Sequence, residues 1–276
     1  MKKLRIKFKV SILRWIEKVF ATSLISWNNM LVYRASILLQ VVAPMAILLL
    51  MKLALWNAIF FQKEELVAGF SWEQMREYHC FFFLSGLLGQ GHSSTNISED
   101  IRMGRISSFL IYPFSFFSLH FSYFWAFQLF QFFVFCLSLL TLVLLGVISP
   151  SLTSLLWGIG YSFFIGFLWF LVQFCIGLVG FWLEETWILR VMVSYLVSLF
   201  SGDYFPLEFF PESWIAILRY TPFPYMGSLA VSVYQGKMSP EMDNAPVVLG
   251  IFLLLLVLGA KFLWTKGLRL YSGAGM

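Results

Sequence analysis

The chain has 276 residues, of which 60% are hydrophobic, 20% are aromatic and 12% are charged, and its formal net charge is +5. A soluble globular domain is about half apolar and a quarter charged, so this composition excludes an ordinary soluble protein. Several apolar stretches exceed about 18 residues, the length that crosses a bilayer as a helix. Because these stretches are continuous, they also argue against a transmembrane β-barrel and predict an all-α membrane protein.

Residues 1–33 are expected to form an N-terminal amphipathic helix, because the start of the chain is too polar to span a membrane. Polar and basic residues recur along one face of this helix at steps of four, three and four: Lys7, Ser11, Arg14 and Lys18. A basic amphipathic helix lies in the membrane interface, with its cations toward anionic lipid headgroups. A purely anchoring role and a role in contacting a partner both stay open.

Six apolar stretches follow and predict six transmembrane helices, at 36–60, 76–95, 116–147, 152–182, 187–204 and 245–265. The second stretch gives the weakest signal, because it is short and rich in Gly and Ser. Six spans put both termini on one side of the membrane. If that side is the cytoplasm, 14 of the 19 Lys and Arg residues lie inside and four outside, as the positive-inside rule requires.

Residues 203–244 lie outside in this topology and combine apolar stretches with frequent Pro and Gly. Proline ends helices, so we expect short helices that dip into the outer leaflet or lie on it. Irregular backbone at membrane depth must be covered by protein, which predicts a re-entrant segment packed on the bundle.

The sequence contains no recognisable catalytic or metal site. It lacks the phosphate-binding loop of ATPases, so any ATP-driven work must come from another chain. The three cysteines and three histidines lack metal-site spacing, and the odd cysteine count argues against structural disulfides. We therefore expect a chain that is not an enzyme and binds no metal, cofactor or nucleic acid.

Four polar side chains fall within the predicted spans: His120, Gln128, Gln131 and Gln173. Amides and small residues hold membrane helices together, so one interpretation is helix packing. The other interpretation is that these side chains line a substrate path. The spans 116–147 and 152–182 contain no buried carboxylate, and Lys52 lies where it could extend outward to the interface, so an ion-driven transporter is disfavoured.

The segment 97–113, "ISEDIRMGRISSFLIYP", is expected to be one short amphipathic helix on the cytoplasmic side. Ser98 would cap its N-terminus and Pro113 would end it, with an apolar edge of Ile106, Phe109 and Leu110. Its charges are expected to be exposed; they alternate in sign and suit a polar socket on a soluble partner: Glu99, Asp100, Arg102 and Arg105. The alternative is a solvated turn at the interface.

Three stretches of the sequence resemble ABC-2-type permeases, the membrane subunits of ABC exporters. Residues 99–117, "EDIRMGRISSFLIYPFSFF", are similar to the signature that follows the second span in this family. Residues 181–190, "FWLEETWILR", resemble the acidic elbow between spans four and five. Residues 201–239 resemble the pattern of Gly, Pro and Tyr-x-Gly-Lys before the last span.

The resemblance implies a single permease domain with the six-helix fold of type V exporters. Such a permease pairs with a second permease, for which a dissimilar chain is slightly favoured over an identical copy. The pair recruits two cytoplasmic ABC ATPases, which bind ATP and Mg. The implied location is the bacterial inner membrane, and the implied substrates are lipids, glycans, peptides or drugs.

The resemblance also implies roles for particular residues. The coupling helix that contacts the ATPase would use Glu99, Asp100, Arg102, Arg105, Ile106 and Phe109. The extracellular gate would lie in the outer segment, with Pro206, Phe209, Pro222 and Phe223. Two other classes stay open, a membrane scaffold without transport activity and an ion-coupled secondary transporter.

Overall fold

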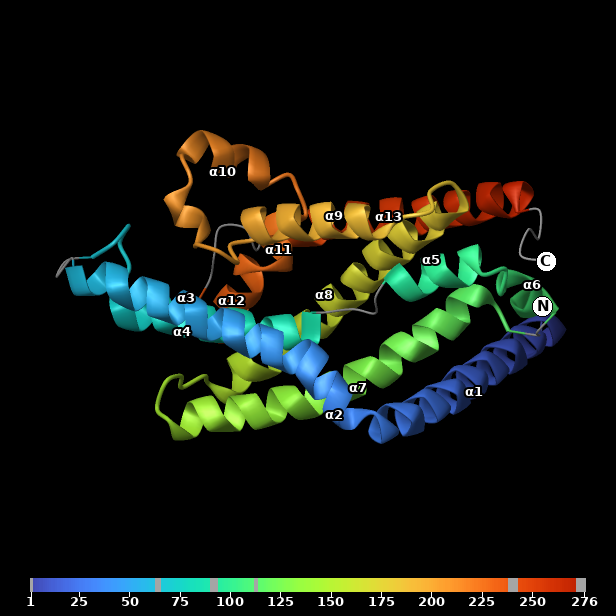
Figure 1. Cartoon of the computed structure of the whole chain (residues 1–276), viewed down its shortest axis with the longest axis horizontal. Helices are drawn as coiled ribbons and strands as arrows, with labels where there is room; N and C mark the ends of the chain where they lie inside the picture. Colours follow the sequence, from blue (N-terminus) through green and yellow to red (C-terminus); the bar gives the residue numbers. More distant parts are fainter. Residues whose placement is uncertain (1, 63–65, 90–93, 112–113, 238–242, 272–276) are drawn as a thin grey trace.

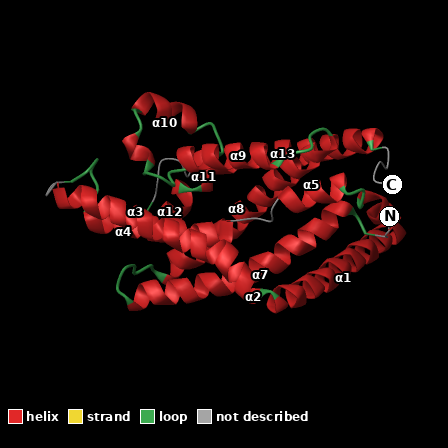
Figure 2. Ribbon diagram, viewed as in Figure 1, coloured by secondary structure: helices red, strands yellow, loops and turns green. Residues whose placement is uncertain are grey.

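The computed structural model describes residues 2–62, 66–89, 94–111, 114–237 and 243–271, and the side chains of 2–12, 62, 94, 95 and 110 are outside that description. The described part is helical and contains no β-strand (Figure 2). Its first elements are α1 (Lys2–Val32), α2 (Arg34–Ile37), the π-helical turn η1 (Leu38–Val42), α3 (Ala43–Gln62), α4 (Trp72–Gly89), α5 (Ser94–Arg102) and α6 (Ile106–Ile111). They are followed by α7 (Phe116–Leu144), α8 (Leu152–Leu178), the 3-10 turn η2 (Val179–Phe181) and α9 (Trp187–Phe200). The last are η3 (Leu207–Phe209), α10 (Glu212–Leu218), α11 (Phe223–Met226), α12 (Ser228–Gln235) and α13 (Ala245–Leu270).

Four helical stretches of the described chain are long and apolar enough to cross a membrane: Arg34–Phe61, Phe116–Leu144, Leu152–Phe181 and Ala245–Leu270. They coincide with four of the six predicted spans, and the chain is therefore a multi-pass membrane protein. The predicted spans 76–95 and 187–204 fall on α4, which is not among the four, and on α9, an apolar helix of 14 residues. Six spans therefore stay a prediction.

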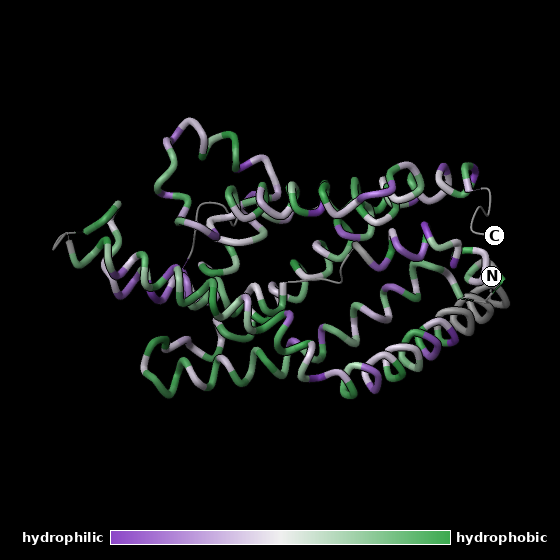
Figure 3. Tube along the Cα trace, in the orientation of Figure 1, coloured by the Kyte–Doolittle hydropathy of each residue, from purple (hydrophilic) through white to green (hydrophobic). Residues whose placement is uncertain are grey.

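The helices form an elongated bundle whose two ends differ (Figure 1). The start of α1 and the end of α13 lie together with α5 and α6 at one end, which we call the termini end. The short helices η3 to α12 gather at the opposite end, which we call the α10 end. Figure 3 shows hydrophobic colour along most of the long helices, with hydrophilic residues concentrated on α1, α5 and the first half of α4.

Helix α1 runs parallel to the first half of α7. The Trp15 indole N–H donates to Ser118 Oγ at 2.8 Å, and the Ser23 hydroxyl donates to the Ser122 carbonyl at 3.0 Å. Further along, the Trp27 ring lies 5.8 Å from the Phe133 ring. The predicted N-terminal helix is thus packed on a long apolar helix, and its interfacial position stays a prediction. The predicted charged face at Lys7 and Ser11 lies outside the described side chains.

The second predicted span falls on two described helices, and residues 90–93 between them lie outside the described residues. Helix α4 ends at Gly89 and α5 begins at Ser94. The last carbonyls of a helix lack partners within it, and the Gln128 amide donates to one of them, that of Leu88. A Cβ at Gly166 would meet this same carbonyl oxygen at 2.5 Å, so only glycine allows α8 to lie this close to α4.

The prediction of one helix over 97–113 was wrong. Helix α5 begins at Ser94, so Ser98 is inside a helix and does not cap one, and Asp100 lies in the last turn. Gly104, at φ +70°, takes the left-handed conformation that ends a helix, with the Arg105 N–H bonded to the Asp100 carbonyl at 3.0 Å. Helix α6 then starts at Ile106. The predicted stop, Pro113, and the side chain of Leu110 lie outside the described residues.

Candidate functional site

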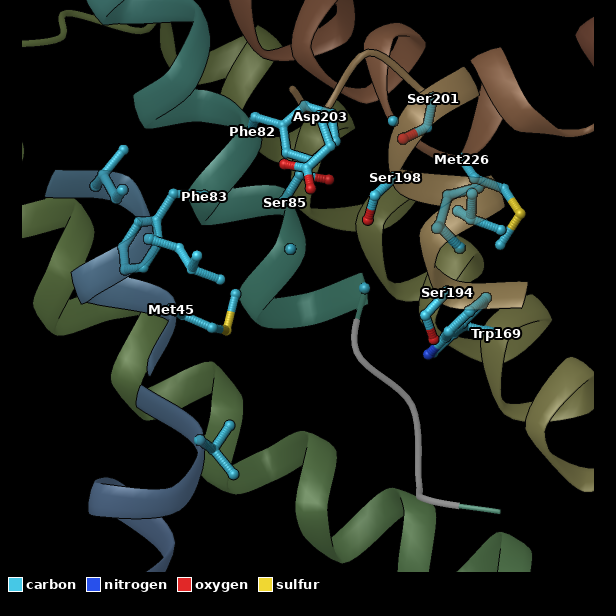
Figure 4. Close-up of a pocket in the computed structure, with 18 of the residues that line it drawn as sticks. Met45, Phe82, Phe83, Ser85, Trp169, Ser194, Ser198, Ser201, Asp203 and Met226 are labelled. Atoms are coloured by element: carbon cyan, nitrogen blue, oxygen red, sulfur yellow. The ribbon is translucent and has the colours of Figure 1, made fainter. Parts of the chain in front are cut away.

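A cavity of about 980 Å³ lies between η1, α3, α4, α8 and α9 (Figure 4). Its walls are mainly apolar and aromatic, with Met45 on α3, Phe83 on α4 and Trp169 on α8 pointing into it. The π-helical turn η1, where one extra residue widens the helix, contributes Gln40 and Val41. Such turns are frequent at functional sites. The cavity is large enough for a drug-sized or lipid-like molecule.

Helix α9 presents a polar stripe to this cavity. Its cavity-facing polar residues recur at steps of four, four and three: Arg190, Ser194, Ser198 and Ser201. These steps place them on one face of a helix whose other residues are mostly apolar. Figure 4 shows Ser194, Ser198 and Ser201 in this arrangement. The stripe runs along the cavity from Arg190, in the first turn of α9, toward the α10 end.

An ion pair stands at the α10 end of the cavity. The Lys52 ammonium bonds to the Asp203 carboxylate and also donates to the Asp203 carbonyl at 2.9 Å. It lies 5.7 Å from the centre of the Phe82 ring and 5.6 Å from that of Tyr204, where cation–π attraction adds to its stabilisation. The expectation that Lys52 extends outward was therefore wrong, because a carboxylate 151 residues away in sequence holds it inside.

A buried histidine lines the cavity near this ion pair. His79 on α4 is 1% exposed, and neither ring nitrogen has a hydrogen-bond partner among the described residues. Trp56 lies 6.1 Å from its ring, and Tyr78 lies 5.4 Å away. The next residue back along α4, Tyr78, donates its hydroxyl proton to the Gly202 carbonyl at 2.8 Å. His79 is therefore level with the segment that carries Asp203.

Only one of the four polar residues predicted to line a substrate path lines this cavity. Gln173 is among its lining residues, whereas His120, Gln128 and Gln131 are fully buried in other parts of the bundle. Gln128 donates a hydrogen bond to the end of α4, which agrees with the helix-packing interpretation. The roles of the other three stay untested.

The predicted coupling segment divides into an inward and an outward face. Asp100 is 7% exposed, accepts a bond from Arg105 Nη1 at 2.9 Å and lies 3.5 Å from His120 Nε2 of α7. The expectation that its carboxylate is exposed was therefore wrong. Ile106 is fully buried, and Phe109 packs 5.5 Å from Phe116. Both apolar residues lie against the bundle, as expected for an anchor.

The outward face of the segment carries Arg102, Met103 and Arg105, all exposed. Glu99 is partly exposed and lies 3.9 Å from Arg105. The acidic elbow at 181–190 also reaches this surface, because Arg102 lies 3.9 Å from Glu185. At such distances and exposures these ion pairs are weak, so the charges are available to a partner.

The end of α13 fastens the turn between α5 and α6. The Tyr271 hydroxyl donates to the Gly104 carbonyl at 2.8 Å and lies 3.1 Å from the Ser107 hydroxyl. Two turns earlier, the Trp264 ring stacks on Phe116 with centroids 5.0 Å apart. The predicted coupling segment thus contacts both α7 and α13.

The predicted gate residues lie at the α10 end, on short helices separated at prolines as the sequence indicated. Phe209 packs edge-on against Trp56 of α3 at 5.4 Å, and Phe223 lies 5.8 Å from Phe200 of α9. Pro206 is buried and Pro222 half-buried. Residues 238–242 of the predicted segment lie outside the described residues. A gating role stays a prediction.

Sequence reasoning missed Lys52, His79, Asp203 and the serine stripe of α9 as site residues. The stripe leaves a readable signal, because Arg190, Ser194 and Ser198 recur every four residues within an apolar run. The Lys52–Asp203 pair leaves no such signal in the sequence, since no local pattern connects two residues that are so far apart in the chain.

Comparison with known proteins identifies the family of the chain. The model of a family described as "ABC-2 family transporter protein" matches residues 46–275, which is most of the chain. The match includes all three stretches that carry the resemblance seen in the sequence and confirms it. No curated protein and no solved structure gives a significant match.

Proposed function

Because this chain belongs to the ABC-2 family of transporter proteins, and is a membrane permease of an ABC transporter, we propose that it exports an amphipathic substrate with energy from a separate ATPase. The observation that carries the proposal is the cavity, which is lined on one side by the polar stripe of α9 and on the other by apolar walls. This combination suits a molecule with a polar headgroup and an apolar tail. The substrate would be a lipid or a similarly amphipathic compound.

Coupling to the ATPase would use the outward face of the α5–α6 turn. Arg102, Arg105 and Glu99 would meet the ATPase, while Ile106 and Phe109 anchor the segment to the bundle. Asp100 would act from the inside, through its contacts with Arg105 and His120. Two ATPase subunits would bind ATP and Mg, and this chain would bind neither.

A second permease would complete the transport path. The cavity-lining residues Leu48 on α3 and Tyr195 on α9 are 55% and 63% exposed, so the cavity is open to the outside of the bundle between these helices. In a membrane, lipid or another permease must cover such an opening. A second permease placed there would enclose the substrate, and we favour a dissimilar chain over an identical copy.

The proposed topology has six spans, in which α4 with α5 forms the second and α9 the fifth. The termini end then faces the cytoplasm of a bacterial inner membrane, which puts the coupling segment within reach of soluble ATPases. The predicted gate, at Pro206, Phe209, Pro222 and Phe223, then closes the cavity on the outside.

The test is an affinity purification of the solubilised chain, with every co-purifying protein identified by mass spectrometry. Recovery of an ABC ATPase is expected, and a second permease recovered with it would establish the pairing. Recovery of several unrelated proteins without an ATPase would favour a membrane scaffold. Transport driven by an ion gradient without ATP would favour a secondary transporter.

A charge-reversal variant then tests the coupling surface. Arg102→Glu with Arg105→Glu should abolish co-purification of the ATPase or separate ATP hydrolysis from transport. Lys237→Glu, a reversal at an exposed residue of the α10 end, is the matched control and should change neither. If the double variant transports normally, the α5–α6 turn is not the coupling site.

A further inference from the structure

We infer that the α10 end of the cavity is a binding site for an acidic headgroup, a phosphate or carboxylate on an apolar chain. The site consists of Lys52, His79 and the polar stripe of α9, with Asp203 as an internal competitor for the ligand. The inference rests on the proposed function and narrows its substrate class to amphipathic anions.

The charges of the cavity wall favour an anion. Among the described lining residues the charged ones are Lys52, Arg190 and Asp203, two cations and one anion. Arg190 lies in the first turn of α9 and Lys52 at the opposite end of the stripe, so a negatively charged headgroup would meet a cation at each end of its path. Moving a charge through such an apolar cavity is costly without these partners.

His79 gives an independent indication that the site takes a ligand. Its imidazole is 1% exposed, and neither nitrogen has a hydrogen-bond partner among the described residues. A neutral imidazole always carries one N–H donor, and a buried donor left without an acceptor costs about 1–3 kcal/mol. A ligand oxygen on the cavity side of the ring would supply that acceptor.

The surroundings of the site suit a ligand that has a polar headgroup at one end and an apolar tail at the other. Lys52 and His79 are cationic or hydrogen-bonding groups at the α10 end, and Ser201 also lines the cavity. Elsewhere the cavity wall offers Met45, Phe83 and Trp169 (Figure 4). A headgroup with negatively charged oxygens therefore suits the first set, and an alkyl chain suits the second.

Asp203 occupies the position of the ligand's acidic group in this structure. Its carboxylate pairs with Lys52, and it belongs to the segment that links α9 to η3. An incoming phosphate or carboxylate would exchange with the Asp203 carboxylate at the Lys52 ammonium. That exchange would remove the ion pair between this segment and α3, so binding of the headgroup would loosen the α10 end, where Phe209 still contacts Trp56.

Photo-crosslinking of the chain alone, in nanodiscs, tests the inference. The probe is a dodecyl phosphate with a diazirine in its alkyl chain, and the control probe carries a trimethylammonium headgroup on the same chain. The phosphate probe should label peptides of α4, α8 and α9 about tenfold more than the cationic probe, the difference that one charge-assisted contact gives. Competition by unlabelled dodecyl phosphate and by dodecanoate distinguishes a phosphate headgroup from a carboxylate.

Variants at the ion pair should change the labelling in opposite directions. Lys52→Gln should reduce it about tenfold by removing the cation, whereas Asp203→Asn should raise it by removing the competitor. His79→Phe should reduce it as well, and Lys261→Gln, at an exposed lysine of α13, should leave it unchanged. If Lys52 and Asp203 only hold the fold together, both variants lose labelling alike and the inference fails.

The labelling of the unaltered chain by the two probes tests the inferred anion site even if a variant does not fold. Equal labelling by both probes, or labelling outside the cavity, overturns the inference. Because no ATPase is present, selective labelling would stand even if no ATPase co-purified, and the proposed function would then fail alone. Conversely, an ATPase complex whose permease shows no preference for the anion leaves the permease function intact.

Discussion

Gly166 sets the distance between α8 and the end of α4. A Cβ at this position would meet the Leu88 carbonyl oxygen at 2.5 Å and the Gln128 amide nitrogen at 2.9 Å. The first of these atoms is backbone and cannot rotate away. Because the Gln128 amide bonds to the same carbonyl, a shift of α8 here disturbs three helices at once.

We expect Gly166→Ala to lower the free energy of unfolding by about 1–3 kcal/mol, the usual cost of overpacking a core. Thermal unfolding of the purified chain in detergent measures this as a lower melting temperature. Gly160→Ala is the control, because it lies on the same helix and its added methyl would meet nothing within 4 Å. Equal melting temperatures for the two variants would show that α8 does not depend on this close approach.

Asp100 connects the predicted coupling segment to the bundle. Its carboxylate lies between Arg105, on the outward turn, and His120, which is fully buried in α7. A push on Arg105 therefore reaches α7 through a single side chain.

We expect Asp100→Asn to keep the ATPase bound but to lower the substrate transported per ATP. A coupling loss of about 1 kcal/mol would give a drop of about fivefold. The measurement is the ratio of transport to ATP hydrolysis in proteoliposomes. Asp243→Asn, at an exposed position near the start of α13, should leave the ratio unchanged. A normal ratio in Asp100→Asn would remove Asp100 from the coupling path.

At the scale of the elements, α6 depends on contacts from outside itself. It has six residues, too few for a stable isolated helix, and its first backbone bond runs from the Ser107 N–H to the Gly104 carbonyl. Tyr271 donates to that same carbonyl and lies next to Ser107. The end of α13 thus supports the turn that precedes α6.

We expect Tyr271→Phe to speed amide exchange over residues 107–109 about fivefold, because it removes hydrogen bonding worth about 1 kcal/mol. Hydrogen–deuterium exchange with mass spectrometry of the peptides that cover α6 measures this. Tyr220→Phe, at an exposed residue of the α10 end, is the control. Unchanged exchange in Tyr271→Phe would mean that Phe109 and Ile106 alone hold α6.

Local sequence predicted some of these elements and not others. The long apolar runs gave the first residues of α7, α8 and α13 and their last residues to within three to five positions, because a continuous apolar run has only one stable form in lipid. The break was missed because Gly104 was read as an interior residue of a single helix from Ser98 to Pro113. The inward direction of Lys52 could not be predicted, since its partner, Asp203, is close only in the folded chain.

At the scale of the whole molecule, the two ends of the bundle should lie on opposite sides of the membrane. Ser108 is exposed at the termini end and Ser213 is exposed on α10. The excess of Lys and Arg at the termini end predicts that this end faces the cytoplasm.

We expect a cysteine at Ser213 to react with an impermeant maleimide in intact spheroplasts, and a cysteine at Ser108 to react only after the membrane is opened. The background is a variant in which Cys80, Cys136 and Cys175 are alanine. Mass shifts on gels measure the reaction. The reverse pattern would invert the topology, and reaction of both positions from one side would exclude an odd number of crossings between them.

The burial of α4 has a consequence for how the chain enters the membrane. Met75, Phe81, Leu84 and Leu88 are fully buried, yet α4 is not among the helices apolar enough to cross on their own. Its surroundings are other helices, chiefly α8, α3, α7 and α12, of which only α3 is synthesised before it. We therefore expect α4 to reach its buried position only after α7, α8 and α12 have emerged. In a nascent chain that stops before α7, only α3 of these four would cover α4, and we expect quality-control proteases to recognise the part that stays uncovered.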